Sequence, residues 1–147
     1  MMSSSINNVQ KTNKLKLDFK DSRYATGRRK KSIAKVWVKK GSGNIHVNGI
    51  KMHEYFKRPV HQIIVTRPLE ISEVSNNYDV KCSVKGGGLS GQAGAIILGI
   101  SKALISHDVG LKKNLKKDKL TTRDSRVVER KKYGHRKARR SFQFSKR

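Results

Sequence analysis

Hydrophobic and polar residues alternate in two segments of the chain, and this alternation predicts two strands of a sheet, over 32–38 and 78–85. Successive side chains of a strand point to opposite faces, so the apolar set of each segment is expected on one buried face. Cys82 belongs to such a set and is expected to be a small buried residue rather than a reactive thiol. The residues expected to be buried are Ala34, Val36, Val38, Val80, Cys82 and Val84.

A different period follows the second strand and predicts a helix over 92–106. Apolar residues recur there at intervals of three and four, which places them on one helical face. A sequence of strands, turn, strands and helix without repeated βα alternation predicts an α+β fold, in which the helix packs across a small sheet. The residues expected on the buried face of the helix are Ala93, Ile96, Ile97, Ile100, Ala103 and Leu104.

Shorter signals complete the predicted domain. Gly41–Asn44 is typical of a tight turn, so the strand beginning at Ile45 is expected to form a hairpin with 32–38. Residues 52–56 are long enough for one helical turn. The run 63–65 is close to Pro68, which would limit a strand there to an edge or a short run.

Charge is distributed very unevenly along the chain, and this distribution indicates what kind of partner the protein binds. The net charge is +25 over 147 residues, with 35 Lys and Arg against 10 Asp and Glu. Residues 45–110 contribute only +2, whereas 1–44 contribute +10 and 111–147 contribute +13. Residues 130–147 hold nine basic side chains and no acidic one. Such a distribution favours binding to RNA or DNA over a merely solvated surface, which usually mixes both signs.

These differences suggest three regions. Residues 1–22 read as a disordered extension, 23–110 as a compact α+β domain, and 111–147 as a basic linker, a short helix and a tail. Within the last region, 122–132 begins with a good N-cap at Thr122 and would place Arg123, Arg126 and Arg130 on one cationic face. The tail beyond it interleaves Phe142 and Phe144 with basic residues, as expected of a segment that binds RNA.

A glycine-rich loop at 86–91 matches G-x-G-x-x-G and stands between the second predicted strand and the helix. A dinucleotide site would need an acidic residue after a further parallel strand, but Asp108 follows the helix directly. A P-loop would need Lys and Ser or Thr where Gln92 and Ala93 stand. We therefore expect no nucleotide cofactor here. The loop still combines small residues such as Gly91 with a helix N-terminus, and can approach a phosphate of an RNA backbone.

Catalytic and metal-binding patterns are weaker still. The five histidines form no H-x-x-x-H pair, and a single Cys supplies no C-x-x-C. We therefore expect no enzyme activity, no catalytic residue, no metal and no small-molecule substrate. We also expect no membrane span, because no stretch of 18 uncharged apolar residues occurs.

Four motifs in the same order make the chain similar to a known family. They are Tyr24–Lys30 (YATGRRK), Gly86–Ala95 (GGGLSGQAGA), Thr122–Lys132 (TRDSRVVERKK) and Arg136–Arg147 (RKARRSFQFSKR). Over about 23–147 the chain resembles the bacterial-type small-subunit ribosomal protein nine family. The resemblance implies the fold of the second domain of small-subunit ribosomal protein five, and a place in the head of the small subunit beside other head proteins.

The resemblance also implies roles for individual residues. The tail of the family passes through rRNA and its last residues approach the P-site tRNA, which would make Lys146 and Arg147 the tRNA-facing pair. The set implied to bind rRNA consists of Arg28, Arg29, Lys30, Lys31, Arg123, Arg126, Arg130, Lys131, Lys132, Arg136, Lys137, Arg139 and Arg140.

Two departures from the family leave questions open. The extension before Arg23 has no counterpart, and Phe142 stands where Pro is expected, so the tail is expected to be less stiff near its tip. Lys exceeds Arg by 23 to 12, which fits an AT-rich genome and favours an organelle-encoded mitochondrial ribosome, with a bacterial cytoplasm as the alternative. A free-standing RNA-binding or RNA-chaperone factor is the alternative function.

Overall fold

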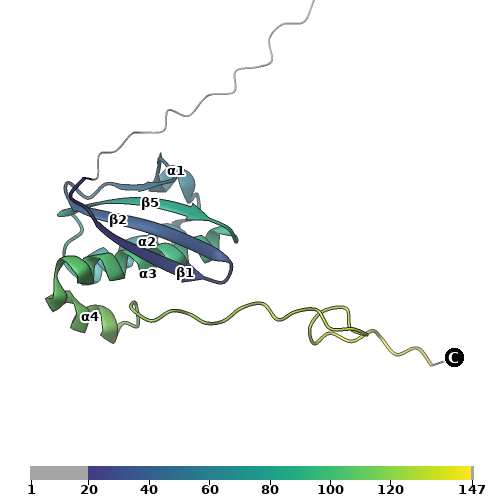
Figure 1. Ribbon diagram of the computed structural model, residues 1–147. Helices are drawn as coiled ribbons and strands as arrows, with labels where there is room; N and C mark the ends of the chain where they lie inside the picture. The colour runs from purple at the N-terminus through teal and green to yellow at the C-terminus, as the bar shows by residue number, and fades with distance from the viewer. Residues whose placement is uncertain (1–19, 147) are drawn as a thin grey trace, which may run out of the picture.

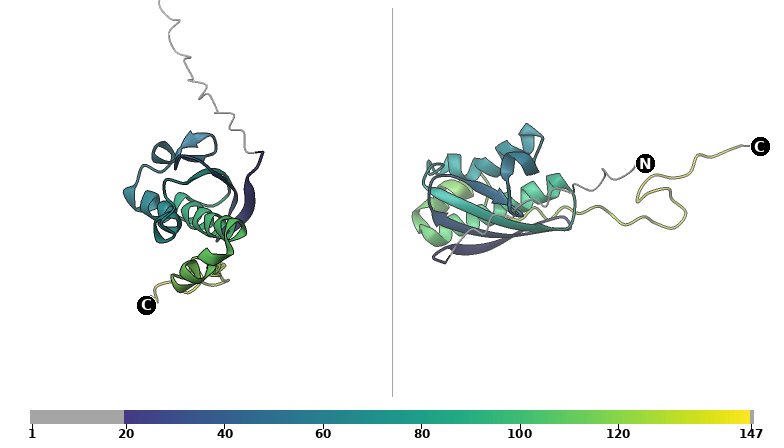
Figure 2. Two further views of the ribbon diagram at one scale, coloured as in Figure 1. Left: turned by 90° about the vertical axis from the view of Figure 1, so that its left-hand side faces the viewer. Right: turned by 90° about the horizontal axis from the view of Figure 1, so that it is seen from above.

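The computed structural model describes residues 20–146 and contains one five-stranded mixed sheet with helices packed across one of its faces (Figures 1 and 2). The predicted extension 1–22 therefore lies almost wholly outside the described residues. The strands are β1 (Arg23–Arg29), β2 (Ser32–Lys40), β3 (Ile45–Val47), β4 (Ile50–Lys51) and β5 (Tyr78–Lys85). The helices are α1 (Met52–Tyr55), α2 (Pro59–Ile71), α3 (Leu89–His107), the 3-10 helix η1 (Val109–Leu111) and α4 (Lys112–Lys117).

The two strands predicted from alternation are confirmed as β2 and β5, which pair antiparallel in the middle of the sheet. Their expected inward residues are all buried, including Val36 and Val80 at 0% exposure. Cys82 is likewise buried, and burial raises the pKa of its thiol because a thiolate would be desolvated there. It therefore behaves as the small core residue that was expected.

The predicted hairpin between 32–38 and 45–47 is wrong, because β5 lies between β2 and β3 in the strand order β1-β2-β5-β3-β4. β3 pairs parallel with β5, and its antiparallel partner is β4. The Gly41–Asn44 loop crosses the start of β5, where the carboxylate of Asp79 accepts hydrogen bonds from the amides of Ser42 (3.0 Å) and Asn44 (2.8 Å). The chain does turn at Gly41–Asn44 as predicted, but the hydrogen bonds to Asp79 hold this loop against β5.

The short strand considered at 63–65 is also wrong, since the residues lie within α2. Pro59 occupies the first turn of this helix, where its missing N–H costs nothing. Four buried residues, His61, Val65, Pro68 and Leu69, follow at helical intervals and form one inward face. Pro68 lies in the last turn and does not end the helix. The helical spacing, rather than the Pro, decides the conformation here.

The helical turn predicted at 52–56 is confirmed by α1, and the helix predicted at 92–106 by the longer α3. Five of the six predicted inward residues of α3 are buried, and Ile97 is half-buried. Strand β1 approaches α3 backbone to backbone at Gly27, where an added Cβ would lie within 3.0 Å of both Ala95 and Gly99 backbone atoms. α3 is long and apolar enough by length and composition to cross a membrane, but most of it is buried inside the domain, as in a core helix.

The region after α3 differs from the prediction in two ways. The segment read as a basic linker contains α4, whose Leu115 is fully buried, so it packs on the domain. The helix predicted over 122–132 does not form, because this stretch has no regular secondary structure. Val127 and Val128 were its only apolar anchors, and both are exposed, at 63% and 85%. A helix without a buried face has no packing to stabilise it. The predicted α+β class is nevertheless confirmed.

Candidate nucleic-acid interface

The glycine-rich loop and the β1–β2 turn lie side by side at one end of the sheet. Antiparallel pairing sets Ile33 opposite Lys85, so that Lys30 and Lys31 come next to the start of the loop. The buried hydroxyl of Ser32 donates a hydrogen bond to the carbonyl of Gly86 (3.0 Å) and ties the two segments together. The sheet register therefore fixes two lysines beside the glycines.

A pocket of ≈ 840 Å³ opens at this end of the domain, at the N-terminus of α3. Lys30 and Lys31 line it together with Arg58, which precedes α2, and Arg130 of the C-terminal segment. No side chain caps the first turn of α3, so its amide groups are open to an outside acceptor. Four cations beside uncapped amides, against the single carboxylate of Glu129, make this a place for an anion such as a phosphate.

The glycines of the loop differ in their surroundings. Gly87 and Gly88 are exposed, and space around the Cβ position of Gly88 is empty to 4 Å. Gly91 is buried, and a Cβ on it would lie 2.8 Å from the hydroxyl oxygen of Ser32. The expectation that Gly91 itself approaches RNA is thus wrong. The open positions are at the start of the loop.

Two contributors to the pocket, Arg58 and His61, were missed from the sequence. His61 is 7% exposed, and its Nε2 lies 3.0 Å from the hydroxyl of Ser90 on the first turn of α3. This contact joins α2 to α3 at the pocket. Recognising Pro59 as the first residue of a helix would have located both residues, because Arg58 precedes it directly and His61 follows in the first turn.

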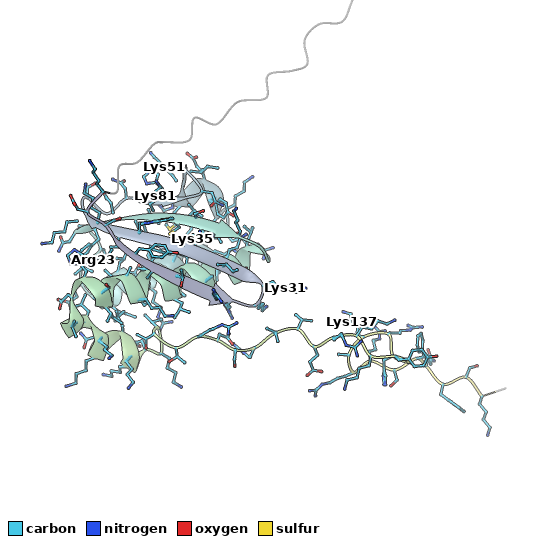
Figure 3. The ribbon with its side chains drawn as sticks, in the orientation of Figure 1. Arg23, Lys31, Lys35, Lys51, Lys81 and Lys137 are labelled. Atoms are coloured by element: carbon cyan, nitrogen blue, oxygen red, sulfur yellow. The ribbon has the colours of Figure 1, made fainter. Side chains whose placement is uncertain are left out.

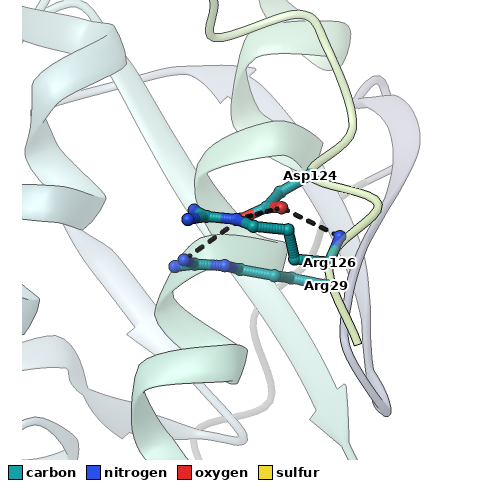
Figure 4. A network of polar contacts seen from close by, with 3 residues as sticks. All are labelled: Arg29, Asp124 and Arg126. Carbon is teal, nitrogen blue, oxygen red and sulfur yellow. Dashed lines mark hydrogen bonds and ion pairs between the residues drawn. The ribbon is translucent and has the colours of Figure 1, made fainter. Parts of the chain in front are cut away.

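The C-terminal segment runs back along the domain from α4 towards this end before it departs (Figure 1). Asp124 attaches this segment to β1. Its carboxylate accepts hydrogen bonds from the Arg126 side chain at 3.0 and 2.9 Å and pairs with Arg29 of β1 at 3.2 Å (Figure 4). The hydrogen bond from the Arg126 guanidinium is the main cause that lowers the pKa of Asp124. The same bond raises the pKa of Arg126.

Arg29 reaches this carboxylate by lying across α3 at Gly94, where an added Cβ would fall 2.2 Å from its Cδ. Only a glycine leaves room for the side chain at this point. The arginine is half-buried, and among the described residues its Nε has no acceptor. Arg29 thus holds the C-terminal segment against the domain.

The outer part of the tail is not uniformly extended. Its chain closes a small loop between His135 and Ser141, which form an isolated antiparallel bridge. Arg139 donates two hydrogen bonds to Glu129, which lowers the pKa of that carboxyl, and the Arg136 guanidinium lies 5.5 Å from the ring centroid of Phe142. Phe142, where Pro was expected, therefore packs against a cation.

The structure brings only some of the predicted RNA-binding residues together. Lys30, Lys31 and Arg130 share the pocket, whereas Arg29, Arg126 and Arg139 are engaged with acidic groups of the same chain. The single cationic face predicted for Arg123, Arg126 and Arg130 does not exist, since no helix forms. Arg147 lies outside the described residues. The other predicted residues, Arg28, Arg123, Lys131, Lys132, Arg136, Lys137, Arg140 and Lys146, have exposed side chains.

Within residues 20–146, no group of three or more His, Cys, Asp and Glu side chains is placed to hold a metal ion. The cations at the pocket and along the tail, together with the α+β domain, define instead a protein of the RNA-binding class. The sequence model of the family described as ribosomal protein S9/S16 matches residues 27–147. The chain belongs to this family, whose members are structural, non-enzymatic proteins of the small ribosomal subunit that bind rRNA.

Proposed function

We propose that this chain holds the small-subunit head together through its tail and supports the P-site tRNA with its tip. The observation that carries the proposal is the course of the segment after Arg130, which runs away from the domain (Figure 1). The basic side chains described along it are exposed. Lys137 and Arg140 are exposed within the closed loop, whereas Lys146 lies beyond it. Two separated groups of cations can serve two RNA partners.

The first group is proposed to clamp rRNA phosphates. Arg136, Lys137, Arg139 and Arg140 lie together in the small loop, and Lys30, Lys31 and Arg130 lie around the pocket. Guanidinium groups bind phosphate oxygens in a bidentate manner, independently of sequence. The arginines of both ion pairs have exposed side chains, so rRNA phosphates can replace their acidic partners.

The second group, Lys146 with Arg147, is proposed to contact the phosphate backbone of the P-site tRNA. Attraction to phosphates suits a site that must accept every tRNA. The terminal carboxylate offsets part of the charge, so the contribution is expected to be about 1–2 kcal/mol, as for hydrogen bonds to charged groups.

The test is tRNA filter binding to small subunits that carry variants of this chain. Deleting residues 146–147 should leave assembly intact and weaken P-site tRNA binding by roughly five- to thirty-fold. Replacing Arg136, Lys137, Arg139 and Arg140 together by Ala should instead reduce the amount of assembled subunit. Wild-type tRNA affinity after the deletion, over a range of magnesium concentrations, would show that the tip is an rRNA anchor only.

Sedimentation after a high-salt wash separates this function from a free-standing RNA chaperone. A constituent of the subunit stays with it, whereas an RNA chaperone is released. The same experiment on ribosomes from separate compartments tests our proposal that the chain works in a mitochondrial ribosome, for which the excess of Lys over Arg, 23 to 12, is the support. Recovery in bacterial-type cytoplasmic ribosomes would overturn that assignment.

A further inference from the structure

The face of the sheet opposite α2 and α3 is crossed by no helix among the described residues, and β1, β2 and β5 run openly along it (Figure 1). Strand alternation decides which side chains it carries. Val36 and Val38 point inward, so Lys35 and Trp37 point outward. The register continues across the sheet, because Tyr24 pairs with Trp37, Trp37 with Lys81, Lys81 with His46, and His46 with Lys51.

Two aromatic side chains lie on the β1 and β2 side of this outer face. The Tyr24 and Trp37 rings are 5.3 Å apart between centroids and tilted by 44°. Tyr24 is 48% exposed although both residues belong to strands. A pair of large rings on an uncovered sheet is unusual, because such rings contribute most when they are buried. The exposed face of either ring offers a surface on which a nucleic-acid base can stack.

The charge of the outer face is strongly positive. Its outward positions hold six basic side chains and one acidic one, Asp79, whose carboxylate is already bound by the amides of Ser42 and Asn44. Figure 3 shows Lys35 and Lys81 in the middle of the sheet and Lys51 at its far edge. The six are Arg28, Lys35, Lys39, Lys51, Lys81 and Lys85.

We propose that this outer face, formed by Tyr24, Lys35, Trp37, Lys51 and Lys81, binds a single-stranded segment of rRNA. The lysines contact its phosphates, and an unpaired base stacks on the Tyr24–Trp37 pair. Unpaired RNA is favoured over a duplex because stacked bases inside a helix cannot reach an aromatic ring. Charge favours RNA over a protein, since a protein partner would need matching acidic groups against six cations.

This contact is distinct from the one proposed for the pocket and tail. The pocket lies at the end of the sheet where the glycine-rich loop begins, and Arg29 and the tail lie on the α3 side. The outer face is on the other side of the same strands. The domain would therefore sit between two RNA segments. The inference rests on the rRNA binding of the family and does not depend on the tRNA contact of the tip.

Trp37 makes the proposal directly testable, because it is the single tryptophan of the chain. Its fluorescence reports on the outer face and not on the tail. We expect a 12-nucleotide uridine RNA, titrated into the full-length protein, to quench this fluorescence in a saturable manner. Anisotropy of the same RNA, labelled at one end, measures total binding to the chain, including binding to the tail.

A double variant tests the role of the lysines. Lys35→Gln with Lys51→Gln should raise the RNA concentration that gives half-maximal quenching of Trp37 about ten-fold. The salt dependence of binding should also become less steep, by about 0.7 in log–log slope for each lost phosphate contact. Lys57→Gln with Lys102→Gln is the matched control, since both lysines are exposed and lie outside the sheet. The control should quench like the wild type. Equal quenching in both double variants would overturn the proposal.

A second measurement places the contact in the assembled subunit. A photoreactive benzoylphenylalanine at position 24 should form an adduct with rRNA that nuclease digestion removes. An adduct with a neighbouring protein, or the lack of an rRNA adduct, overturns the assignment of RNA as the partner. So does RNA binding by anisotropy without any change in Trp37 fluorescence. Either result leaves the function proposed for the tail untouched.

Discussion

The domain and the tail use the same residue types in opposite ways. Valines of β2 and β5 are buried, whereas Val128 at the start of the C-terminal segment is 85% exposed. The phenylalanines differ in the same manner, since Phe56 is fully buried and Phe144 is 88% exposed. In the domain, removal of apolar surface from water fixes the conformation. In the tail the same side chains remain available to a partner.

Charge shows the same contrast. The acidic groups of the tail each bind an arginine of the chain, as Asp124 binds Arg126 and Glu129 binds Arg139. The arginines of these pairs are exposed, and ion pairs of this kind contribute little to stability. They arrange the basic side chains without neutralising the +13 of residues 111–147. We expect a segment of this kind to take its final conformation from an RNA partner, and the domain to fold without one.

The largest expected effect on stability comes from a substitution at Gly27, where β1 packs most closely against α3. Gly27→Val places a side chain against the backbone of α3, where neither partner can rotate away. We expect the free energy of unfolding to fall by about 3 kcal/mol or more, at the upper end for overpacked sites. Urea unfolding of the full chain measures this fall.

Gly88→Ser is the matched control, because space around the Cβ position of Gly88 is empty and serine is a favourable residue at a helix N-cap. Its effect should stay within about 0.5 kcal/mol. Equal midpoints for both variants would show that the close approach of β1 and α3 does not limit stability.

A second pair of variants locates the boundary between the two regions. Leu115→Ala empties a fully buried site between α4 and the domain and should cost about 3 kcal/mol, as for other buried leucines. Val128→Ala, 13 residues further on, should change the free energy of unfolding by less than about 0.5 kcal/mol. A small loss of unfolding free energy in Leu115→Ala would show that α4 contributes little to the domain, and that the region after α3 acts as the linker predicted from the sequence.

Strand alternation and helical spacing predicted β2, β5 and α3 from the sequence, because each has a buried face with a clear period. The position of β3 could not be predicted in this way. It depends on Asp79, which lies 35 residues from Asn44 and receives its amide hydrogen bond. The failure at 122–132 has a related cause, since an N-cap and a cationic face do not make a helix without buried residues.

The candidate interface was predicted in a similarly uneven way. The motifs located the glycine-rich loop, and the charge run located the tail. Their relation depends on contacts far apart in sequence, such as Arg29 with Asp124 and Ser32 with Gly86. Arg58 lines the pocket because it directly precedes α2, a helix that the sequence did not predict. Local patterns thus identify the parts of the interface, whereas sheet register and long-range pairing bring them together.

The smallest expected effect is a change in backbone mobility after substitution of Asp124, where the C-terminal segment contacts the domain. In Asp124→Asn the start of the tail loses its charged link to Arg29, so the amides of 122–128 should become more mobile on the picosecond-to-nanosecond timescale. Heteronuclear NOE values of the full chain measure this change. Glu129→Gln is the control, because it breaks the pair with Arg139 inside the tail and leaves the link to the domain intact.

The pH dependence of this link follows from the lowered pKa of Asp124, which arises mainly from the hydrogen bond of Arg126. A carboxyl whose pKa is lower in the folded state stabilises the contact fully above its unfolded value of about 3.9, and loses it as the pH falls through the lower folded value. The amide shifts of 122–128 in the wild type should therefore stay constant from pH 7 to about 4 and change only below. A transition centred near pH 4 would mean that Asp124 is paired with neither Arg126 nor Arg29 in solution.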